Sequence, residues 1–332
     1  MAMMRLNAKQ VLARHDKALT KKEDFRSLYD EAYEFALPQR NLYDGYYDGG
    51  VQGQKKMNRV FDSTAINSTQ RFANRMQSGI FPPQRKWCRL QPGSDIPQDR
   101  KAEAQAALDV YNDKLFDTLK QSNFDIAIGE FLLDLCVGTA VMLVQPGDDT
   151  NPINFISVPQ FLVAFDEGAN GQVDNVYRRM KLKAESIQRQ WPDAEIPAEL
   201  KNLIDQKPTE EVELVEATVF DPERGDYCYH VIDKRSKTEL VYRRMDHTPW
   251  IVSRYAKVAG ETYGRGPLIT AMPDIKTLNK TLELVLKNAS LSISGVYTAA
   301  DDGVLNPNTV RIMPGAIIPV ARNGGPQGES LK

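Results

Sequence analysis

The sequence predicts an α+β protein in which helices come first, an antiparallel β region follows, and one long helix comes next. Three observations predict this class. Apolar residues recur every three or four positions over 5–36, 62–79, 98–121 and 124–137. Between 152 and 258 they instead form short alternating runs that turn-forming residues separate. The helical spacing then returns over 267–293.

Composition excludes several classes of protein. The 332 residues favour about two domains, and 42 basic against 44 acidic residues give a net charge of −2. This balance argues against a protein that clamps nucleic acid through bulk positive charge. The cysteines are odd in number and far apart (Cys88, Cys136 and Cys228), so neither a disulfide framework nor a zinc site is predicted. The N-terminus lacks the apolar core of a signal peptide, and synthesis in a reducing, intracellular compartment is expected.

The first helix is expected over 5–36, as one helix or two joined helices, because Pro38 stops the pattern. A polar loop rich in tyrosine and glycine follows at 38–56, and such a loop could order on a partner. The second helix, at 62–79, has Asp62 or Ser63 as its N-cap.

A short strand is predicted at Trp87–Leu90, followed by helices at 98–121 and 124–137 with Ser122 or Asn123 between them. Ile126–Val144 is the most apolar window of the chain. Because Glu130 and Asp134 interrupt it, a buried helix that ends at Gly138 and then a buried strand explain it better than a membrane span.

The middle of the chain is predicted to be antiparallel β structure with a short helical insert at 184–205. His230 is expected to be a partly exposed strand residue, because no metal-ligating partner lies at a suitable spacing. The expected strands are 153–157, 161–166, 173–182, 212–220, 227–233, 238–243 and 250–257.

The long helix follows Gly264, Arg265, Gly266 and Pro267, which are interpreted as a hinge with a helix-starting proline. One apolar stripe is predicted along this helix as a packing surface. It consists of Ile275, Leu278, Leu282, Val285, Leu286, Ala289 and Ile293. A second face carries Lys276, Lys280 and Lys287, and Glu283 could pair with Lys280. These lysines are either a solvated face or, in a ring, a surface that contacts phosphates without reading sequence.

No residue pattern predicts catalysis, a metal or a cofactor. Asp148-Asp149 and Asp301-Asp302 lie beside turn-forming residues, so turns are expected there. The chain has neither a Gly-x-Ser-x-Gly elbow nor a phosphate-binding loop. We therefore expect a protein that is not an enzyme. A metal-dependent nuclease or other α+β enzyme, and a monomeric neck or adaptor module, stay open as alternatives.

Several segments, in this order along the chain, resemble the portal, or head-to-tail connector, proteins of short-tailed bacteriophages. They are Arg26-Ser-Leu-Tyr-Asp-Glu-Ala-Tyr-Glu-Phe-Ala-Leu-Pro38, Phe61-Asp-Ser-Thr-Ala65, Phe81-Pro-Pro83 with Trp87 and Leu90, Tyr263-Gly-Arg-Gly-Pro267, Ala271-Met-Pro-Asp-Ile275, Leu278-Asn279 and Pro314-Gly-Ala-Ile317.

The resemblance implies a structural protein of the virion, made in the bacterial cytoplasm, that forms a dodecameric ring at one capsid vertex. Double-stranded DNA would pass through its channel without sequence specificity during packaging and ejection. The implied partners are other copies of the chain, terminase, a tail adaptor, and capsid and scaffolding proteins.

The resemblance also divides the chain. Residues 1–262 would form a wing, 263–293 a hinge and the first stem helix, and 294–332 a short β-containing clip. The implied docking residues of the clip are Asp301, Asp302, Arg311 and Arg322.

The chain departs from the family pattern at two points. Family members return through a second stem helix, a tunnel loop and a crown, and this sequence contains none of them. Cys88 also stands where the family tends to have a second aromatic residue after the tryptophan.

Overall fold

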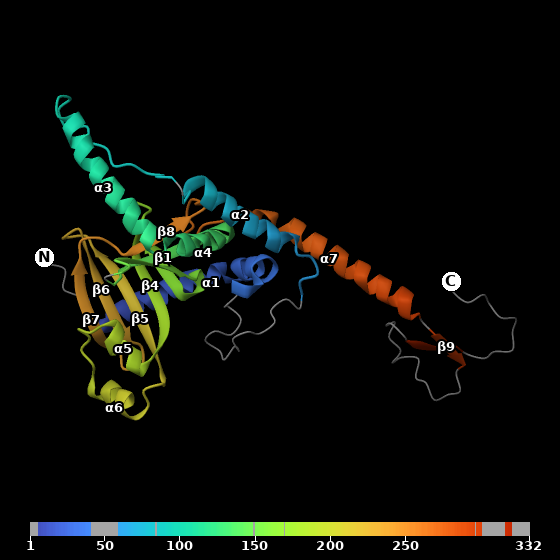
Figure 1. The fold of residues 1–332 in the computed structure, drawn as a ribbon. Helices are drawn as coiled ribbons and strands as arrows, with labels where there is room; N and C mark the ends of the chain where they lie inside the picture. Colours follow the sequence, from blue (N-terminus) through green and yellow to red (C-terminus); the bar gives the residue numbers. More distant parts are fainter. Residues whose placement is uncertain are drawn as a thin grey trace. The chain divides into compact units, whose positions relative to one another are not determined.

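The computed structural model describes residues 6–40, 59–83, 85–148, 150–168, 170–295, 297–300 and 316–320. It is a mixed α+β structure, as the sequence predicts (Figure 1). The chain divides into two compact units. The first holds Ser63–Met272 and the chain before Arg59, and the second holds Arg59–Asp62 and the chain from Pro273 onward.

Helix α1 (Ala8–Ala36) is a single helix with a capping box at its start. The side chain of Asn7 accepts a hydrogen bond from the backbone N–H of Gln10 (2.9 Å), and the Gln10 side chain accepts one from the N–H of Asn7 (3.0 Å). The helix ends before Pro38, as predicted, and a short 3₁₀ turn η1 (Pro38–Arg40) follows it.

A five-stranded antiparallel sheet, in the order β3-β4-β5-β6-β7, forms most of the predicted β region. The helical insert between β4 and β5 is two short helices instead of one, α5 (Ala184–Gln190) and α6 (Ala198–Gln206). The strands are β3 (Val163–Glu167), β4 (Val173–Lys183), β5 (Glu211–Asp221), β6 (Asp226–Asp233) and β7 (Thr238–Met245).

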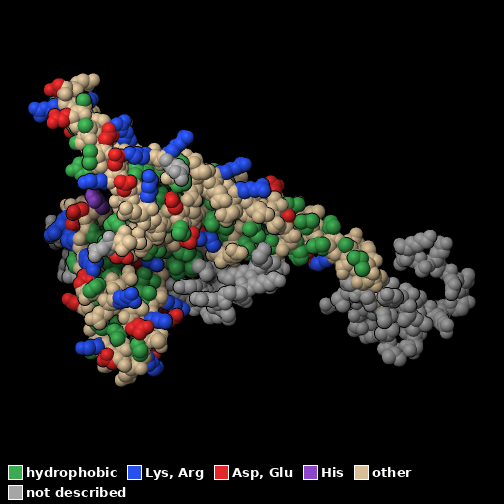
Figure 2. All heavy atoms as spheres, viewed as in Figure 1, with side chains coloured by type: hydrophobic (Ala, Val, Ile, Leu, Met, Phe, Trp, Pro, Cys, Tyr) green, Lys and Arg blue, Asp and Glu red, His purple; other side chains and the backbone are tan. Residues whose placement is uncertain are grey.

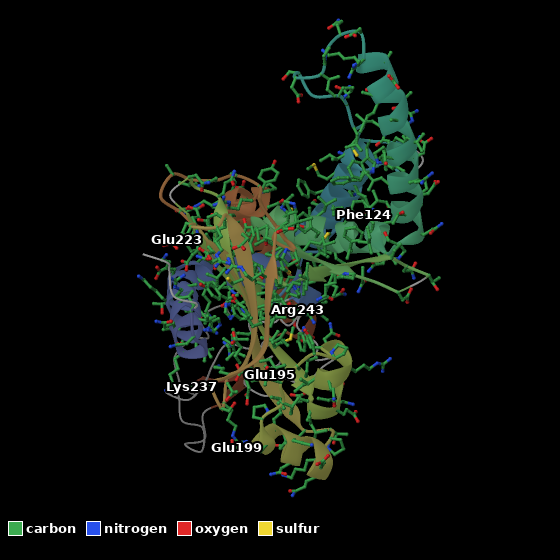
Figure 3. The ribbon with its side chains drawn as sticks, turned by 90° about the vertical axis from the view of Figure 1, so that its left-hand side faces the viewer. Phe124, Glu195, Glu199, Glu223, Lys237 and Arg243 are labelled. Carbon is green, nitrogen blue, oxygen red and sulfur yellow. The ribbon has the colours of Figure 1, made fainter. Side chains whose placement is uncertain are left out.

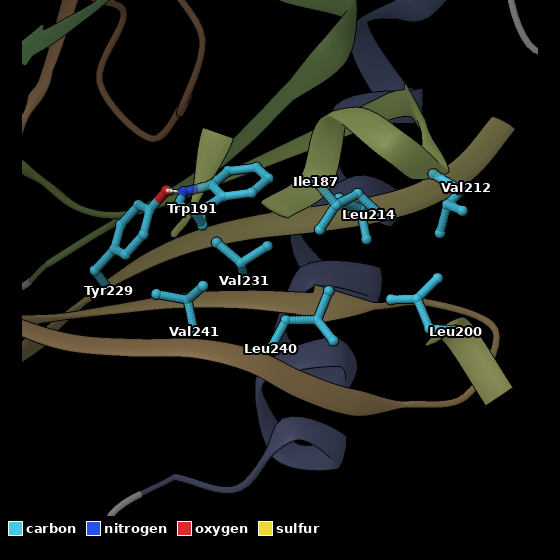
Figure 4. Close-up of a cluster of buried hydrophobic side chains, with 10 residues drawn as sticks. Ile187, Trp191, Leu200, Val212, Leu214, Tyr229, Val231, Leu240 and Val241 are labelled. Atoms are coloured by element: carbon cyan, nitrogen blue, oxygen red, sulfur yellow. Dashed lines mark hydrogen bonds between the residues drawn. The ribbon is translucent and has the colours of Figure 1, made fainter. Parts of the chain in front are cut away.

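Both faces of the middle of this sheet carry buried apolar residues. Alternate residues of β5 point to opposite faces: Leu214 packs in the cluster beneath α5 and α6, and Val215 packs against α1. In the first cluster, Trp191 donates a hydrogen bond from its indole N–H to the hydroxyl of Tyr229 (3.1 Å; Figure 4). The N–H of Glu195 also donates to the carbonyl of Leu240 in β7 (2.7 Å), and Figure 3 labels Glu195 beside the sheet.

A smaller antiparallel sheet, in the order β2-β1-β8, packs against α2 and α4. The predicted helix and strand within Ile126–Val144 are confirmed as α4 and β1, which Gly138 separates. None of the described helices is long and apolar enough to cross a membrane. The elements are α2 (Thr64–Ile80), α4 (Phe124–Val137), β1 (Thr139–Pro146), β2 (Ile153–Val158) and β8 (Trp250–Arg254).

The predicted strand at Trp87–Leu90 is wrong. This exposed stretch has no ladder partner among the described residues, and it runs instead beside α3 (Lys101–Gln121). Arg89 pairs with Asp109 through two hydrogen bonds (2.9 and 2.7 Å), and the Trp87 ring lies 5.5 Å from that of Phe116. The side chains of this stretch contact a helix instead of a neighbouring strand.

The expectation for His230 is also wrong, because the side chain is fully buried within β6. Its Nδ1 lies 2.5 Å from a carboxylate oxygen of Glu239 on the neighbouring strand. Burial of both faces of the sheet leaves no exposed side for this residue. Cys88, Cys136 and Cys228 are free thiols.

Helix α7 (Pro267–Ser294) is the predicted long helix, and the boundary between the two units falls within it, between Met272 and Pro273. The second unit continues with β9 (Tyr297–Ala300) and β10 (Ile317–Val320), which pair in parallel. The segments expected to hold strands, around Asp301 and Pro314, lie outside the described residues.

Candidate functional site

Gly264, just before α7, is fixed by hydrogen bonds to two other elements of the first unit. The hydroxyl of Tyr29 on α1 donates to the carbonyl of Gly264 (2.5 Å), and the N–H of Gly264 donates to the hydroxyl of Thr139 on β1 (2.9 Å). The N–H of Gly266 donates to the carbonyl of Val137 at the end of α4 (2.9 Å). Three elements that are distant in sequence therefore meet at the start of the long helix.

Glycine is required at this junction because backbones approach closely. A Cβ added to Gly264 would lie 2.4 Å from the carbonyl oxygen of Gly138, and one added to Gly266 would lie 2.1 Å from that of Cys136. The sequence interpretation of these glycines as a hinge did not anticipate this packing. Bending at this segment stays a prediction.

Tyr263 anchors the same segment in an aromatic cluster. Its side chain is fully buried, and its ring centroid lies 4.3 Å from that of Phe165 and 5.3 Å from that of Phe25. Burial raises the pKa of Tyr263 well above its ordinary value and that of Tyr29 to about 12, so both phenols are neutral at physiological pH. Exposed Arg265 instead pairs with Glu261.

A buried ion pair lies close to the end of α1. Both oxygens of Asp134 on α4 accept hydrogen bonds from Arg40 (3.1 and 2.8 Å), and Oδ1 also accepts one from the hydroxyl of Tyr33 (3.0 Å). Burial raises the pKa of Asp134, and the guanidinium of Arg40 opposes that shift. Tyr33 lies in the Arg26–Pro38 segment, so the structure gives this motif a role in joining α1 to α4.

Pro267 is the first residue of α7, as predicted, and the N–H of Ile269 donates to the carbonyl of Gly266 (3.1 Å). A second proline, Pro273, lies inside the helix. Its carbonyl accepts a hydrogen bond from the hydroxyl of Thr277 one turn later (2.9 Å).

The predicted apolar stripe lies along α7 and is largely exposed. Leu286 is 54% exposed and Ile293 86% exposed, although both are large aliphatic residues. Figure 2 shows hydrophobic side chains at the surface along this helix. At 3.6 residues per turn the seven stripe residues cover an arc of about 100°. The other members are Ile275 and Leu282, which are half-buried, and Leu278, Val285 and Ala289, which are exposed.

The three lysines occupy a face of α7 that lies about 150° around the helix axis from the centre of the stripe, and all are exposed. Glu283 lies between two of them and accepts hydrogen bonds from Lys280 (2.9 Å) and Lys287 (2.5 Å), which confirms the predicted pairing with Lys280. The two ammonium groups hold the pKa of Glu283 below its ordinary value. Glu283 offsets one of these charges, so the lysine face stays positive with Lys276 one turn away.

The structure adds Asn279, which was not singled out as a site residue. Its Oδ1 accepts hydrogen bonds from the N–H groups of Phe61 (2.7 Å) and Asp62 (3.3 Å), and its Nδ2 donates to the carbonyl of Arg59 (2.9 Å). Phe61 and Asp62, from one segment that carries the family resemblance, are therefore in contact with Asn279, from another, within the second unit. The available signal was that Asn279, a polar residue, lies between Ile275 and Leu282 on the same face of the helix.

The remaining predicted residues are not assembled into a site. Asp148 forms a turn, as expected, by accepting hydrogen bonds from the N–H groups of Thr150 and Asn151 (2.9 and 2.7 Å). Within the described ranges no group of three or more histidine, cysteine or acidic residues is placed to hold a metal ion. Four predicted docking residues lie outside the described residues: Asp301, Asp302, Arg311 and Arg322.

Two curated phage proteins are similar to this chain. A protein named "Probable portal protein" of Bordetella phage BPP-1 is 24% identical over 288 residues, which are 81% of this chain and 50% of that protein. The "Portal protein" of Enterobacteria phage T3 is 22% identical over 246 residues, 71% of this chain and 45% of that protein. The chain thus spans about half the length of these relatives.

A family model covers nearly the whole chain. The family described as "Bacteriophage head to tail connecting protein" matches residues 8–331, a range that includes the segments quoted above and every element from α1 to β10. The chain belongs to this family of bacteriophage head-to-tail connecting proteins.

Proposed function

We propose that this chain is the subunit of a phage portal. Copies of it would form a ring at one capsid vertex, through which double-stranded DNA enters during packaging and leaves during ejection. The proposal rests on membership of the connector family and on the names of both relatives. Terminase, a tail adaptor, and capsid and scaffolding proteins are the proposed partners.

The exposed apolar stripe of α7 is the structural observation that carries the proposal. Several large aliphatic residues on one helix face are costly to leave in water, at roughly 25 cal/mol for each Å² of apolar surface. A neighbouring copy that covers this face would remove that cost. Stripes of this kind on a soluble chain mark interaction surfaces.

The proposed division of labour follows from the faces of α7. The stripe packs subunits together, and Lys276, Lys280 and Lys287 face the DNA. Partial neutralisation by Glu283 suits a channel, because tight neutralisation of phosphates would hold DNA in place. Residues 1–262 would form the wing, 263–293 the bending segment and first stem helix, and 294–332 the clip.

The direct test is the assembly state of the purified chain, by mass measurement and negative-stain imaging. Rings with a central hole support the proposal, and a monomer at high concentration contradicts it for this chain. Leu282→Asp with Leu286→Asp places charges in the stripe and should reduce ring yield at least tenfold. Thr281→Asp with Asn288→Asp, at exposed positions outside the stripe, is the matched control and should leave rings intact.

A further inference from the structure

The middle of the Lys86–Leu90 segment presents backbone groups with no hydrogen-bond partner among the described residues, whereas the carbonyl of Leu90 accepts a bond from the Gln105 side chain (3.2 Å). Within the described residues, no hydrogen bond joins the backbone N–H or C=O of Trp87, Cys88 or Arg89 to another residue. The stretch contains no turn or helix, and its side chains are exposed or only partly covered. The sequence analysis predicted a strand at Trp87–Leu90.

Side-chain contacts nevertheless hold this segment against α3 and α4 of the first unit. Lys86 pairs with Asp113 and Arg89 with Asp109, two acids one turn apart on α3. Trp87 stacks on Phe124 at a centroid distance of 5.9 Å, and Figure 3 labels Phe124 at the start of α4. The segment is therefore pre-positioned, and a partner strand would have less conformational freedom to remove from it.

Strand β8 supplies a matching open edge. It lies at one side of the three-stranded sheet, and in the part of the chain that the structure describes it pairs with β1 alone. The carbonyl of Pro249 accepts from the N–H of Val144 on β1, and the N–H of Tyr255 donates to the carbonyl of Gly138 just before β1. The alternation of the antiparallel ladder therefore directs the N–H and C=O of Val252 away from β1. Ile251, at 46% exposed, and Tyr255, at 47%, lie along this strand and its end.

Two other sheet edges of the first unit, on β2 and on β7, are capped. The side chain of Asn123 accepts from the N–H of Phe155 (2.9 Å) and donates to its carbonyl (2.7 Å), which occupies the outer edge of β2. On β7, the carbonyl of Leu240 accepts a hydrogen bond from the N–H of Glu195. Capping of this kind prevents unwanted strand pairing. On β8 the N–H of Trp250 donates to the hydroxyl of Thr248 (3.2 Å), but among the described residues Val252 has no comparable cap.

We propose that Lys86–Leu90 of one copy adds to the open edge of β8 in the next copy, as a fourth strand of its small sheet. The inference rests on the proposed self-association of the chain and names a contact outside α7. Both stretches are five residues long, and each exposes aliphatic side chains, Leu90 (44%) on one and Ile251 on the other. Donor and acceptor are different surfaces, so the contact is head-to-tail and can close into a ring.

Cys88 allows a direct test, because it is the exposed cysteine at the centre of the segment. Single variants Ile251→Cys and Ser253→Cys, in the full chain, would be oxidised with copper–phenanthroline or treated with a short bismaleimide. Paired strands bring Cα atoms to about 4.5–5.5 Å, which suits a disulfide. At least one variant should give a ladder of cross-linked oligomers, roughly tenfold above Asn202→Cys on exposed α6, and Cys88→Ser should abolish it.

Two results would overturn the inference. One is a ring in which neither variant cross-links above the α6 control, which leaves the proposed portal function intact. The other is a Cys88–Cys88 dimer as the sole product, because that requires a symmetric contact. If the chain forms no ring at all, that result contradicts the proposed function instead. Negative-stain images taken before oxidation show whether rings are present.

A proline variant tests the same contact without cysteine chemistry. Val252→Pro removes an N–H that points away from β1, so the fold should survive, whereas Ser253→Pro removes one that the β1 ladder uses. Val252→Pro should reduce ring yield several-fold at an unchanged melting temperature. Normal rings from a folded Val252→Pro variant would contradict the inference.

Discussion

The hydroxyl of Tyr29 and the carbonyl of Gly264 are joined by a buried hydrogen bond across 235 positions of the sequence. Tyr29 is fully buried, so the bond has no competition from water. Tyr29→Phe removes the hydroxyl, so the buried carbonyl of Gly264 loses this hydrogen-bond donor. The free energy of unfolding should fall by about 1–3 kcal/mol. Urea unfolding measures this. Tyr111→Phe, at a tyrosine that is 64% exposed, should change stability little.

Gly266→Ala tests the close packing at the base of α7. The new methyl group would lie 2.1 Å from the carbonyl oxygen of Cys136, so α4 or α7 must move, at a cost of about 1–3 kcal/mol or more. Gly79→Ala, in a helix with open space around it, should instead gain about 0.5–1 kcal/mol. Equal melting temperatures for the two variants would show that the junction is loosely packed.

Asn279→Ala removes the side chain that holds Arg59–Asp62 within the second unit. Three hydrogen bonds disappear, so this segment should open more often and trypsin should cleave after Arg59 several-fold faster. Mass spectrometry of a time course gives the rate at this single bond. Asn288→Ala, at an exposed position of the same helix, serves as the control, and a cleavage rate equal to it would rule out this role.

Lys22 makes the stability of the first unit depend on pH. Its ammonium nitrogen lies buried against the carbonyls of Gln160 (2.8 Å) and Phe161 (2.5 Å), and burial lowers its pKa from 10.5 to about 7. Between pH 7 and 10 the unfolded chain therefore holds a proton that the folded chain has released. Stability must rise with pH in this window, by at most roughly 1.4 kcal/mol per unit, and this contribution is constant below it.

The matched measurement compares Lys22→Met with the parent chain in urea at pH 7, 8 and 9. The difference in free energy of unfolding, parent minus variant, should increase with pH, because the variant lacks the titrating group. A difference that stays flat or falls would mean that Lys22 keeps its proton in the folded chain.

Reversal of the lysine face separates DNA contact from assembly. Lys276→Glu, Lys280→Glu and Lys287→Glu together should impair DNA packaging or retention, while ring yield stays close to normal, because these residues lie off the apolar stripe. Lys114→Glu, Lys120→Glu and Lys201→Glu make the same change of charge at exposed positions elsewhere. Normal packaging by the first triple variant would remove the proposed channel-facing role.

Periodicity was sufficient to predict most elements of this fold. The strands from β2 to β7 and the helices α1, α4 and α7 begin and end within a few residues of the predicted bounds, because each has a periodic apolar pattern and a clear stop or start, such as Pro38, Gly138 or Pro267. Trp87–Leu90 failed because a residue pattern specifies an extended backbone without specifying what lies beside it. A segment is a strand only when a second strand pairs with it, and here helix α3 lies beside the segment instead.

The candidate site was only partly predictable for a related reason. The stripe and the Lys280–Glu283 pair follow from spacing on one helix, so local reasoning finds them. The roles of Tyr29, Gly264 and Asn279 depend on residues more than 200 positions away, and no periodicity reports such contacts. The burial of His230 was missed because a covered second face of a sheet is a tertiary property.

The hydrogen bonds at the base of α7 also have a mechanical meaning. A tensile load on the first turn of the helix would be shared by α1, β1 and α4, since Tyr29, Thr139 and Val137 each hold the same short segment. Bonds that bear load in parallel must rupture together, whereas bonds in series fail one at a time. We therefore expect the anchor of this helix to resist pulling.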